Sequence, residues 1–159
     1  MPLFGGWMVA LGLAFWLVPA GQPVLRLAAG LSAVAAALAG ATPVTANDID
    51  PYSLAAAEAN ATANNVRVAT LEADILDTDP PAAVILAGDV FYSREMAARV
   101  LPFLHRAAGR GCLVLVGDPG RAYLPPNGLI KQATYTVPVN ESLEGASVRE
   151  TIIWQVSAH

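Results

Sequence analysis

Charged residues are scarce in this chain of 159 residues, of which 14% are charged and 55% are hydrophobic. So little charge excludes a disordered chain, because such chains combine low hydrophobicity with high charge. The apolar residues suffice for a sizeable core, and the length fits one domain of ordinary size. We therefore expect a globular domain.

Basic residues are also few, and they form no visible patch. The net charge is −4. Five arginines of the second half are spread over one predicted helix and a loop beyond the next strand, at Arg94, Arg99, Arg106, Arg110 and Arg121. Because nucleic-acid binding requires a basic surface, we do not expect nucleic acid among the partners.

Cysteine and histidine are nearly absent. The single cysteine, Cys112, excludes an internal disulfide and weakly indicates a reducing compartment, so we expect a cytoplasmic protein. It opens the apolar run 112–116, which favours a buried structural thiol over a nucleophile. The two histidines, His105 and His159, belong to no Cys/His cluster, so we expect no metal site.

The start of the chain, residues 1–23, carries no charged side chain at all. The absence of Lys or Arg there argues against a signal peptide. Glycine and proline interrupt the apolar run before it reaches the ~20 residues that a membrane-spanning helix needs. We expect a buried or partly exposed amphipathic helix over 6–17, with a membrane-associated segment as the open alternative.

Apolar runs and turn residues predict alternating strands and helices from residue 24 onward. Predicted strands cover 24–27, 44–46, 66–71, 82–87 and 113–116, and predicted helices cover 31–39, 52–64 and 94–108. Several strands are apolar along their whole length, which is typical of a parallel sheet covered on both faces. Residues 130–139 and 148–156 alternate, which predicts an antiparallel hairpin. The fold class is therefore α/β, with one domain over 24–159.

Carboxylates follow four of the predicted strands, at Asp48, Asp74, Asp89 and Asp118. The carboxyl ends of parallel strands meet at one edge of the sheet, where α/β folds bind ligands. We therefore expect these side chains to converge on one cleft. The alternative is that polar residues simply have to follow buried strands.

The stretch 44–51 reads as a short buried strand that ends on two carboxylates and turns into a helix. Asp50 precedes Pro51 and is a good helix cap, because proline is favoured in the first helical turn. Asp48 stands where a carboxylate accepts hydrogen bonds from both hydroxyls of a ribose. The alternative is that Asp48 and Asp50 only cap the helix.

Three motifs in order carry a resemblance to a known family. They are Ala-Asn-Asp-Ile-Asp-Pro at 46–51, Leu-Ala-Gly-Asp-Val-Phe-Tyr at 86–92 and Val-Gly-Asp-Pro-Gly-Arg-Ala-Tyr-Leu at 116–124. With these motifs, and the tail over 137–151, the chain resembles the class I, seven-β-strand methyltransferases that use S-adenosylmethionine. Within that class it is similar to bacterial relatives of the lysine methyltransferase that modifies the β-subunit of electron transfer flavoprotein. The resemblance implies a Rossmann-like, doubly wound, mostly parallel seven-stranded sheet with a C-terminal antiparallel hairpin.

By this resemblance, S-adenosylmethionine is the expected cofactor. Asp48 would accept hydrogen bonds from its ribose hydroxyls, and Ile49 would pack on its adenine. Asp74 would accept a hydrogen bond from the adenine amino group, with Ile75 beside it. Gly30 would belong to the turn that approaches the methionine part.

The resemblance also implies methyl transfer to a lysine amine of a protein, and it suggests the flavoprotein β-subunit as that protein. Asp89 and Tyr92 form an Asp-x-x-Tyr motif that borders the pocket where the amine meets the methyl group. The reaction requires alignment of two atoms and loss of a proton from the amine. Asp89 can hold the lysine ammonium, and Phe91 or Tyr92 can favour a cationic centre. The alternative for Phe91 is packing under the sheet edge.

One motif departs from the family. The first strand of the family ends in an acidic residue and leads into a glycine-rich turn, but here Arg26 takes the acidic position and only Gly30 remains in a shorter turn. An arginine cannot accept hydrogen bonds from the N–H groups of that turn. Two alternatives to an active enzyme therefore stay open: an impaired methyltransferase-like domain that serves as a scaffold, and a membrane-associated protein held by its apolar start.

Overall fold

The computed structural model describes residues 24–27, 31–79, 82–138 and 148–158. The start of the chain and Gly30 lie outside these ranges, so the helix over 6–17 and the glycine turn stay predictions. Within the described ranges, no helix is both long enough and apolar enough to cross a bilayer.

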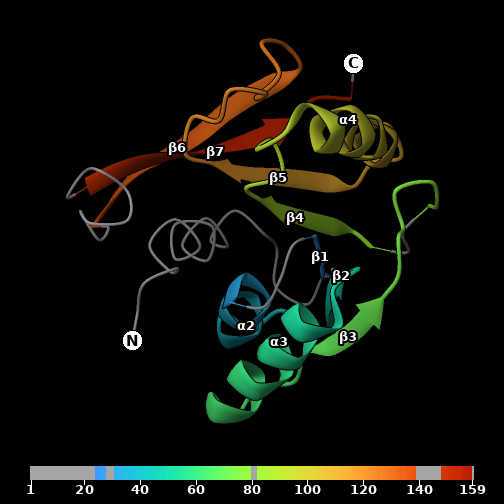
Figure 1. Ribbon diagram of the computed structural model, residues 1–159, viewed down its shortest axis with the longest axis vertical. Coiled ribbons are helices and arrows are strands. Elements are labelled where there is room, and N and C mark those ends of the chain that lie inside the picture. Colours follow the sequence, from blue (N-terminus) through green and yellow to red (C-terminus); the bar gives the residue numbers. More distant parts are fainter. Residues whose placement is uncertain (1–23, 28–30, 80–81, 139–147, 159) are drawn as a thin grey trace.

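The strands form one sheet with helices packed on both sides (Figure 1). In chain order the strands are β1 (Val24–Leu27), β2 (Val44–Asp48), β3 (Ala69–Glu72), β4 (Val84–Gly88), β5 (Leu113–Asp118), β6 (Leu129–Pro138) and β7 (Val148–Val156). Their order across the sheet is β3-β2-β1-β4-β5-β7-β6. The first five pair in parallel, and β7 runs antiparallel to both β5 and β6. The predicted α/β class is confirmed.

The central strands are buried on both faces, which explains why they read as continuous apolar runs. In β4, Val84 and Leu86 pack in the core cluster that contains α2 (Leu31–Leu38) and α3 (Pro51–Ala63). Ile85 and Ala87 of the same strand pack in the opposite cluster, which contains α4 (Arg94–Gly109). Figure 1 shows α2 and α3 on one side of the sheet and α4 on the other.

The helices that border the carboxyl edge of the sheet begin where local hydrogen bonds are available. The Asp50 carboxylate accepts a hydrogen bond from the backbone N–H of Tyr52 at 3.0 Å, and Pro51 occupies the first turn of α3. This confirms Asp50 as a helix cap. At α4, the Ser93 hydroxyl accepts a hydrogen bond from the N–H of Met96 at 3.1 Å.

The parallel pairing brings the carboxyl ends of five strands to one edge. β1 lies between β2 and β4, so the chain leaves β1 toward one side of the sheet and later returns to the other. Ligands of open α/β sheets bind outside the strand ends at such a reversal. In the register of β2 and β3, Asp48 aligns with Glu72, which places the loops after both strands side by side.

Cys112 lies at the other edge, just before β5. Its thiol is half-buried and donates a hydrogen bond to the carbonyl of Ala82 at 3.0 Å. The thiol thus links the two segments that lead into β4 and β5. This contact fits a structural thiol, although the side chain is less buried than the apolar run predicts.

Phe103 is fully buried in the core cluster beneath α4. We expect Phe103→Ala to lower the free energy of unfolding by about 3–5 kcal/mol, because it removes apolar contacts and leaves a cavity. Urea unfolding followed by circular dichroism measures this loss. Tyr52→Ala serves as the control, since the Tyr52 side chain is 84% exposed and its loss should cost little. Equal losses for the two variants would contradict the assignment of the core.

Candidate functional site

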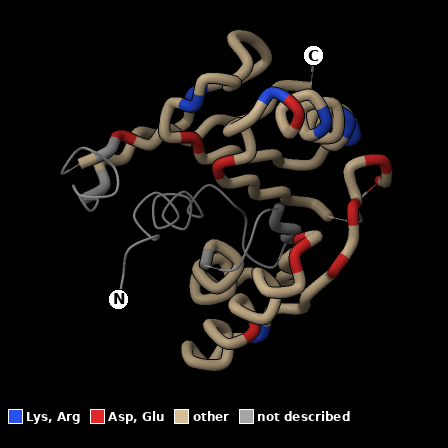
Figure 2. Tube along the Cα trace, viewed as in Figure 1, with Lys and Arg blue, Asp and Glu red and all other residues tan. Residues whose placement is uncertain are grey.

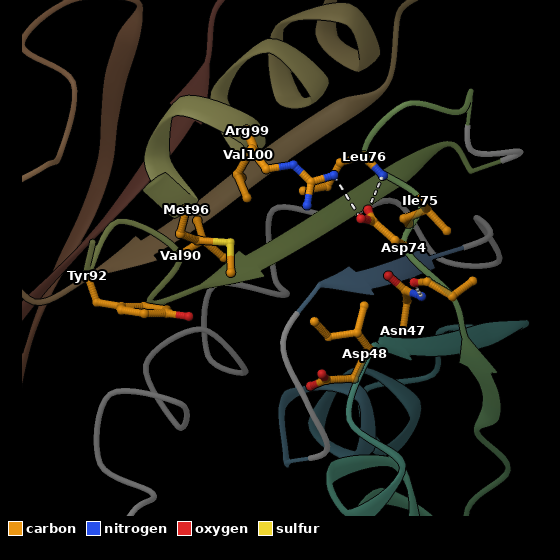
Figure 3. Close-up of a pocket in the computed structure, with 12 residues that line it drawn as sticks. Asn47, Asp48, Asp74, Ile75, Leu76, Val90, Tyr92, Met96, Arg99 and Val100 are labelled. Atoms are coloured by element: carbon orange, nitrogen blue, oxygen red, sulfur yellow. Dashed lines mark hydrogen bonds and ion pairs between the residues drawn. The ribbon is translucent and has the colours of Figure 1, made fainter. Parts of the chain in front are cut away.

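A pocket of about 230 Å³ opens at the carboxyl edge of the sheet (Figure 3). Its walls come from the end of β2, the loop after β3, the loop after β4 and the first turns of α4. It is lined by Asn47, Asp48, Ile49, Ala73, Asp74, Ile75, Leu76, Val90, Tyr92, Met96, Arg99 and Val100. Every described residue that the sequence assigned to the cofactor therefore lines this pocket, together with Tyr92 from the acceptor side.

Asp48 is the carboxylate of the pocket with spare hydrogen-bonding capacity. One of its oxygens accepts a hydrogen bond from the backbone N–H of Asp50 at 3.0 Å, and the other accepts none from any residue that the structure describes. Asp50 performs the helix capping, so Asp48 is not needed for it. In Figure 3 the Asp48 carboxylate and the Tyr92 ring extend toward one another across the pocket.

Asn47 fixes the loop that forms the neighbouring wall. Its side chain is 5% exposed, and its amide nitrogen donates to the carbonyls of Leu71 and Ala73, at 2.8 Å each. A buried amide nitrogen that donates to two carbonyls in this way stabilises one loop conformation. The sequence reasoning assigned no role to Asn47; the available signal was a polar residue at the end of an apolar strand.

Asp74 and Ile75 follow β3 and have different environments. Ile75 is 7% exposed and reaches the core cluster beneath α4 while also lining the pocket. The Asp74 carboxylate pairs with Arg99 at 2.7 Å and accepts a hydrogen bond from the N–H of Leu76 at 3.2 Å. The hydrogen bond from Arg99, reinforced by that of Leu76, holds the pKa of Asp74 below its ordinary value. Arg99 was also missed from the sequence.

Ile49 lies at the mouth of the pocket. Its side chain is 67% exposed, although it directly follows a buried strand. Burying such a side chain against an apolar partner is favourable. Ile49 therefore offers a surface on which a flat ring can pack.

Asp89 forms a bidentate ion pair that the sequence did not predict. The Arg121 guanidinium donates from Nε to Oδ1 at 2.5 Å and from Nη2 to Oδ2 at 2.6 Å. The Asp89 backbone has a φ of 53°, and its N–H donates to the carbonyl of Gly117 at 3.0 Å. Asp89 does not line the pocket itself, although Val90 and Tyr92 do.

Asp118 belongs to the same charge cluster. It is 1% exposed, and its Oδ1 accepts hydrogen bonds from the N–H groups of Gly120 and Arg121, both at 2.7 Å. Its Oδ2 is buried and has no hydrogen-bond partner among the described residues. Burial, the largest effect, raises the pKa of Asp118 above its ordinary value, and the nearby Asp89 charge adds to it.

The four carboxylates that follow the strands thus form two groups and do not all face one cleft. Asp48 and Asp74 line the pocket, whereas Asp89 and Asp118 gather around Arg121. Arg121, in the loop after β5, bonds to both: its guanidinium pairs with Asp89, and its backbone N–H donates to Asp118. Within the described part of the chain, no three His, Cys, Asp or Glu side chains gather as metal ligands.

Phe91 requires a correction. Its side chain is 0% exposed and packs in the core cluster beneath α4, so it does not reach the pocket. The alternative stated for Phe91, packing under the sheet edge, therefore holds, because residue 91 points inward where the chain leaves β4. Tyr92, its neighbour, is 56% exposed and lines the pocket.

Comparisons with known proteins point to one class. Residues 25–97 match the family model of the ribosomal protein L11 methyltransferase (PrmA). The chain is 32% identical over 133 residues to the electron transfer flavoprotein beta subunit lysine methyltransferase of Xenopus laevis, and 33% identical over 148 residues to the protein of that name from Danio rerio. These matches cover 79% and 87% of this chain but 54% and 57% of the relatives, so the chain spans little more than half their length.

A solved structure supports the fold. The magnesium protoporphyrin IX methyltransferase (ChlM) from Synechocystis PCC 6803, determined with bound SAH, matches with a TM-score of 0.66 at 16% identity. The match covers 94% of this chain and 82% of that chain. This likeness shows a Rossmann-like α/β fold, and the Rossmann-like architecture implied by the motifs is confirmed.

The opposite pKa shifts of Asp118 and Asp74 predict opposite effects of pH on stability. Folded Asp118 keeps its proton at pH values where the unfolded chain has lost it, so the free energy of unfolding falls as pH rises through the window above the ordinary Asp pKa. Asp118→Asn removes this penalty, and its stability relative to wild type should increase from acid to neutral pH. For Asp74 the pKa is lowered, so wild type loses stability as pH falls, and Asp74→Asn should approach wild type in acid.

Thermal or urea unfolding across the acid to neutral range measures both differences. Each variant is the control for the other, since both replace one carboxylate by an amide at the same edge of the sheet. Differences from wild type that are independent of pH for both variants would contradict these assignments.

Proposed function

We propose that this chain, which belongs to the class I methyltransferase family, binds S-adenosylmethionine and transfers its methyl group to a lysine amine of a protein. The observation that carries the proposal is the half-buried Asp48 with an oxygen left to bind a ligand, beside the exposed Ile49, in a pocket at the carboxyl edge of the sheet. The domain over 24–159 is the unit to which we assign this activity.

The described side chains fit the adenosine part of the cofactor. A carboxylate at the end of β2 can accept hydrogen bonds from both ribose hydroxyls, and Asp48 has the capacity to do so. Ile49 and Ile75 supply apolar surface for the adenine ring. Asp74 keeps lone pairs for the adenine amino group, since each of its oxygens accepts one hydrogen bond within the protein. Gly30 is proposed for the methionine part.

The acceptor side is proposed at Tyr92 and Asp89. Bound S-adenosylmethionine supplies an electrophilic methyl group on a sulfonium, so the protein has to present a neutral amine in line with it. Tyr92 is exposed at the pocket, where its ring can hold a cationic amine by its face. Asp89 can accept a hydrogen bond from that amine, while Arg121 offsets the Asp89 charge. This offset avoids strong stabilisation of the unreactive ammonium form.

The lysine of the electron transfer flavoprotein β-subunit is the substrate we propose, because the relatives carry that activity in their names. A cytoplasmic location is part of the same proposal and is supported by the single cysteine. The second candidate is a scaffold domain without activity. It is favoured by Arg26 and the loss of glycines from the turn after β1.

Cofactor binding is tested by calorimetric titration with S-adenosylhomocysteine. We expect the wild-type chain to bind it and Asp48→Ala to bind about 10–100-fold more weakly, because hydrogen bonds from two hydroxyls to a charged acceptor are lost. Asp50→Ala is the matched control: it should lower stability by about 1 kcal/mol through loss of the helix cap, yet leave binding unchanged. Absence of binding by a folded wild-type chain would support the scaffold.

Methyl transfer is tested with purified electron transfer flavoprotein and S-adenosylmethionine, with the modified lysine located by mass spectrometry. We expect Asp89→Asn to lower kcat by about a hundredfold, since the amine loses its charged acceptor, without a change in S-adenosylhomocysteine affinity. Glu58→Gln removes the same charge on α3, where Glu58 bonds to Thr70, and should leave kcat unchanged. An Asp89→Asn variant with the kcat of wild type would contradict a role for Asp89 at the acceptor site.

A further inference from the structure

Helix α4 carries a row of three arginines on one face. Arg99, Arg106 and Arg110 are spaced by seven and four residues, and side chains at such spacings lie above one another along a helix. The adjoining face of α4, which includes Phe103 between Arg99 and Arg106, supplies buried residues to the core. The row therefore stands at the side of the sheet, where α4 meets the segment after β3.

All three arginines reach that segment. The Nη2 atom of Arg99 lies 2.7 Å from the Asp74 carboxylate and 3.8 Å from that of Asp77. Arg106 donates a hydrogen bond from Nη2 to the carbonyl of Leu76 at 2.5 Å. Arg110 forms an ion pair with Asp79. Figure 2 shows the basic residues of α4 beside the acidic residues of the segment that follows β3.

We call these three side chains the arginine clamp: Arg99, Arg106 and Arg110. The segment they hold, residues 74–79, includes Asp74, Ile75 and Leu76, which line the pocket. Just before the segment, the carbonyls of Leu71 and Ala73 accept hydrogen bonds from the Asn47 amide of β2. The segment follows β3, the edge strand of the sheet, so among the described residues no further strand supports it.

We propose that the arginine clamp sets the affinity of the pocket for the adenosine part of its ligand and makes that affinity sensitive to salt. The proposal rests on the function proposed above. Arg106 and Arg110 act as positioning residues, because they contact the Leu76 carbonyl and Asp79 without lining the pocket, whereas Arg99 also lines it. Each contact is exposed and weak alone, and salt screens it. When the contacts loosen together, a smaller fraction of molecules holds a formed wall, and the apparent affinity falls by that fraction.

The test uses 5′-methylthioadenosine, which has the adenosine part but no charge. A salt effect on its binding cannot come from screening of the ligand, so it reports on ion pairs within the protein. Calorimetric titrations are made at ionic strengths of about 0.01 M and 1 M, between which the Debye length falls from about 30 Å to 3 Å. Salting-out of an apolar ligand strengthens its binding to wild type and to every variant by the same factor. The quantity to compare is therefore the salt-induced change in affinity of wild type against that of each variant.

We expect wild-type affinity to fall about fivefold between low and high salt. The variant Arg99→Gln/Arg106→Gln/Arg110→Gln should bind at low salt about fivefold more weakly than wild type and should respond little to salt. Arg94→Gln is the matched control, because it removes the same charge from α4 but contacts Tyr123, with its guanidinium 5.9 Å from the ring centre. It should behave as wild type. Arg99→Lys/Arg106→Lys/Arg110→Lys keeps the charge and should recover part of the affinity.

If the triple glutamine variant does not fold, the same titrations at low and high salt are made on wild type and on the single variant Arg106→Gln, and their comparison tests the clamp. A salt response of wild type that equals that of the glutamine variant, or a glutamine variant with wild-type affinity at low salt, overturns the clamp. In that case binding of S-adenosylhomocysteine would leave the proposed function standing. A folded wild-type chain that binds neither ligand overturns both.

Discussion

Parallel pairing of strands buried on both faces is the constraint on which the site depends. Because β4 and β5 have core on each side, polar side chains are excluded from their length and return only where the strands end. Parallel direction then sends all these ends to one edge. Carboxylates accumulate at this edge because the strands are buried, and only some of these carboxylates are then used to bind a ligand.

The partners of each carboxylate decide how much hydrogen-bonding capacity it keeps for a ligand. Asp50 is occupied by the start of α3, Asp74 by Arg99, Asp89 by Arg121, and Asp118 by the loop after β5. Asp48 alone among these keeps an oxygen without a partner in the described part of the chain while lining the pocket. Its assignment to the ribose hydroxyls therefore rests on its hydrogen-bonding state as well as on its position.

Helix α4 contributes residues both to the core and to the site. The apolar face packs Phe103 and Leu104 against β4 and β5, which fixes the helix. Its first turns then supply Met96 and Val100 to the pocket, while its arginines reach across to the segment after β3. Packing energy in the core thus positions groups that are individually too exposed to position themselves.

Sequence alone determined the fold class and the placement of most elements. Continuous apolar runs marked the buried strands, and Asp50-Pro51 marked the start of α3, because burial and helix capping depend on neighbours in sequence. Asp48 and Asp74 were singled out as carboxylates that follow predicted strands, and the resemblance to a family added Ile49, Ile75 and Tyr92.

Only the tertiary structure decided which side chains meet across the edge of the sheet. Arg99 and Arg121 lie 25 and 32 residues from the aspartates they bind, and no local pattern encodes such pairs. The same holds for Phe91, whose direction at the end of β4 depends on how the loop leaves the strand. Spacing in sequence fixes what is adjacent along an element, whereas ion pairs and burial at a strand end depend on how separate elements pack.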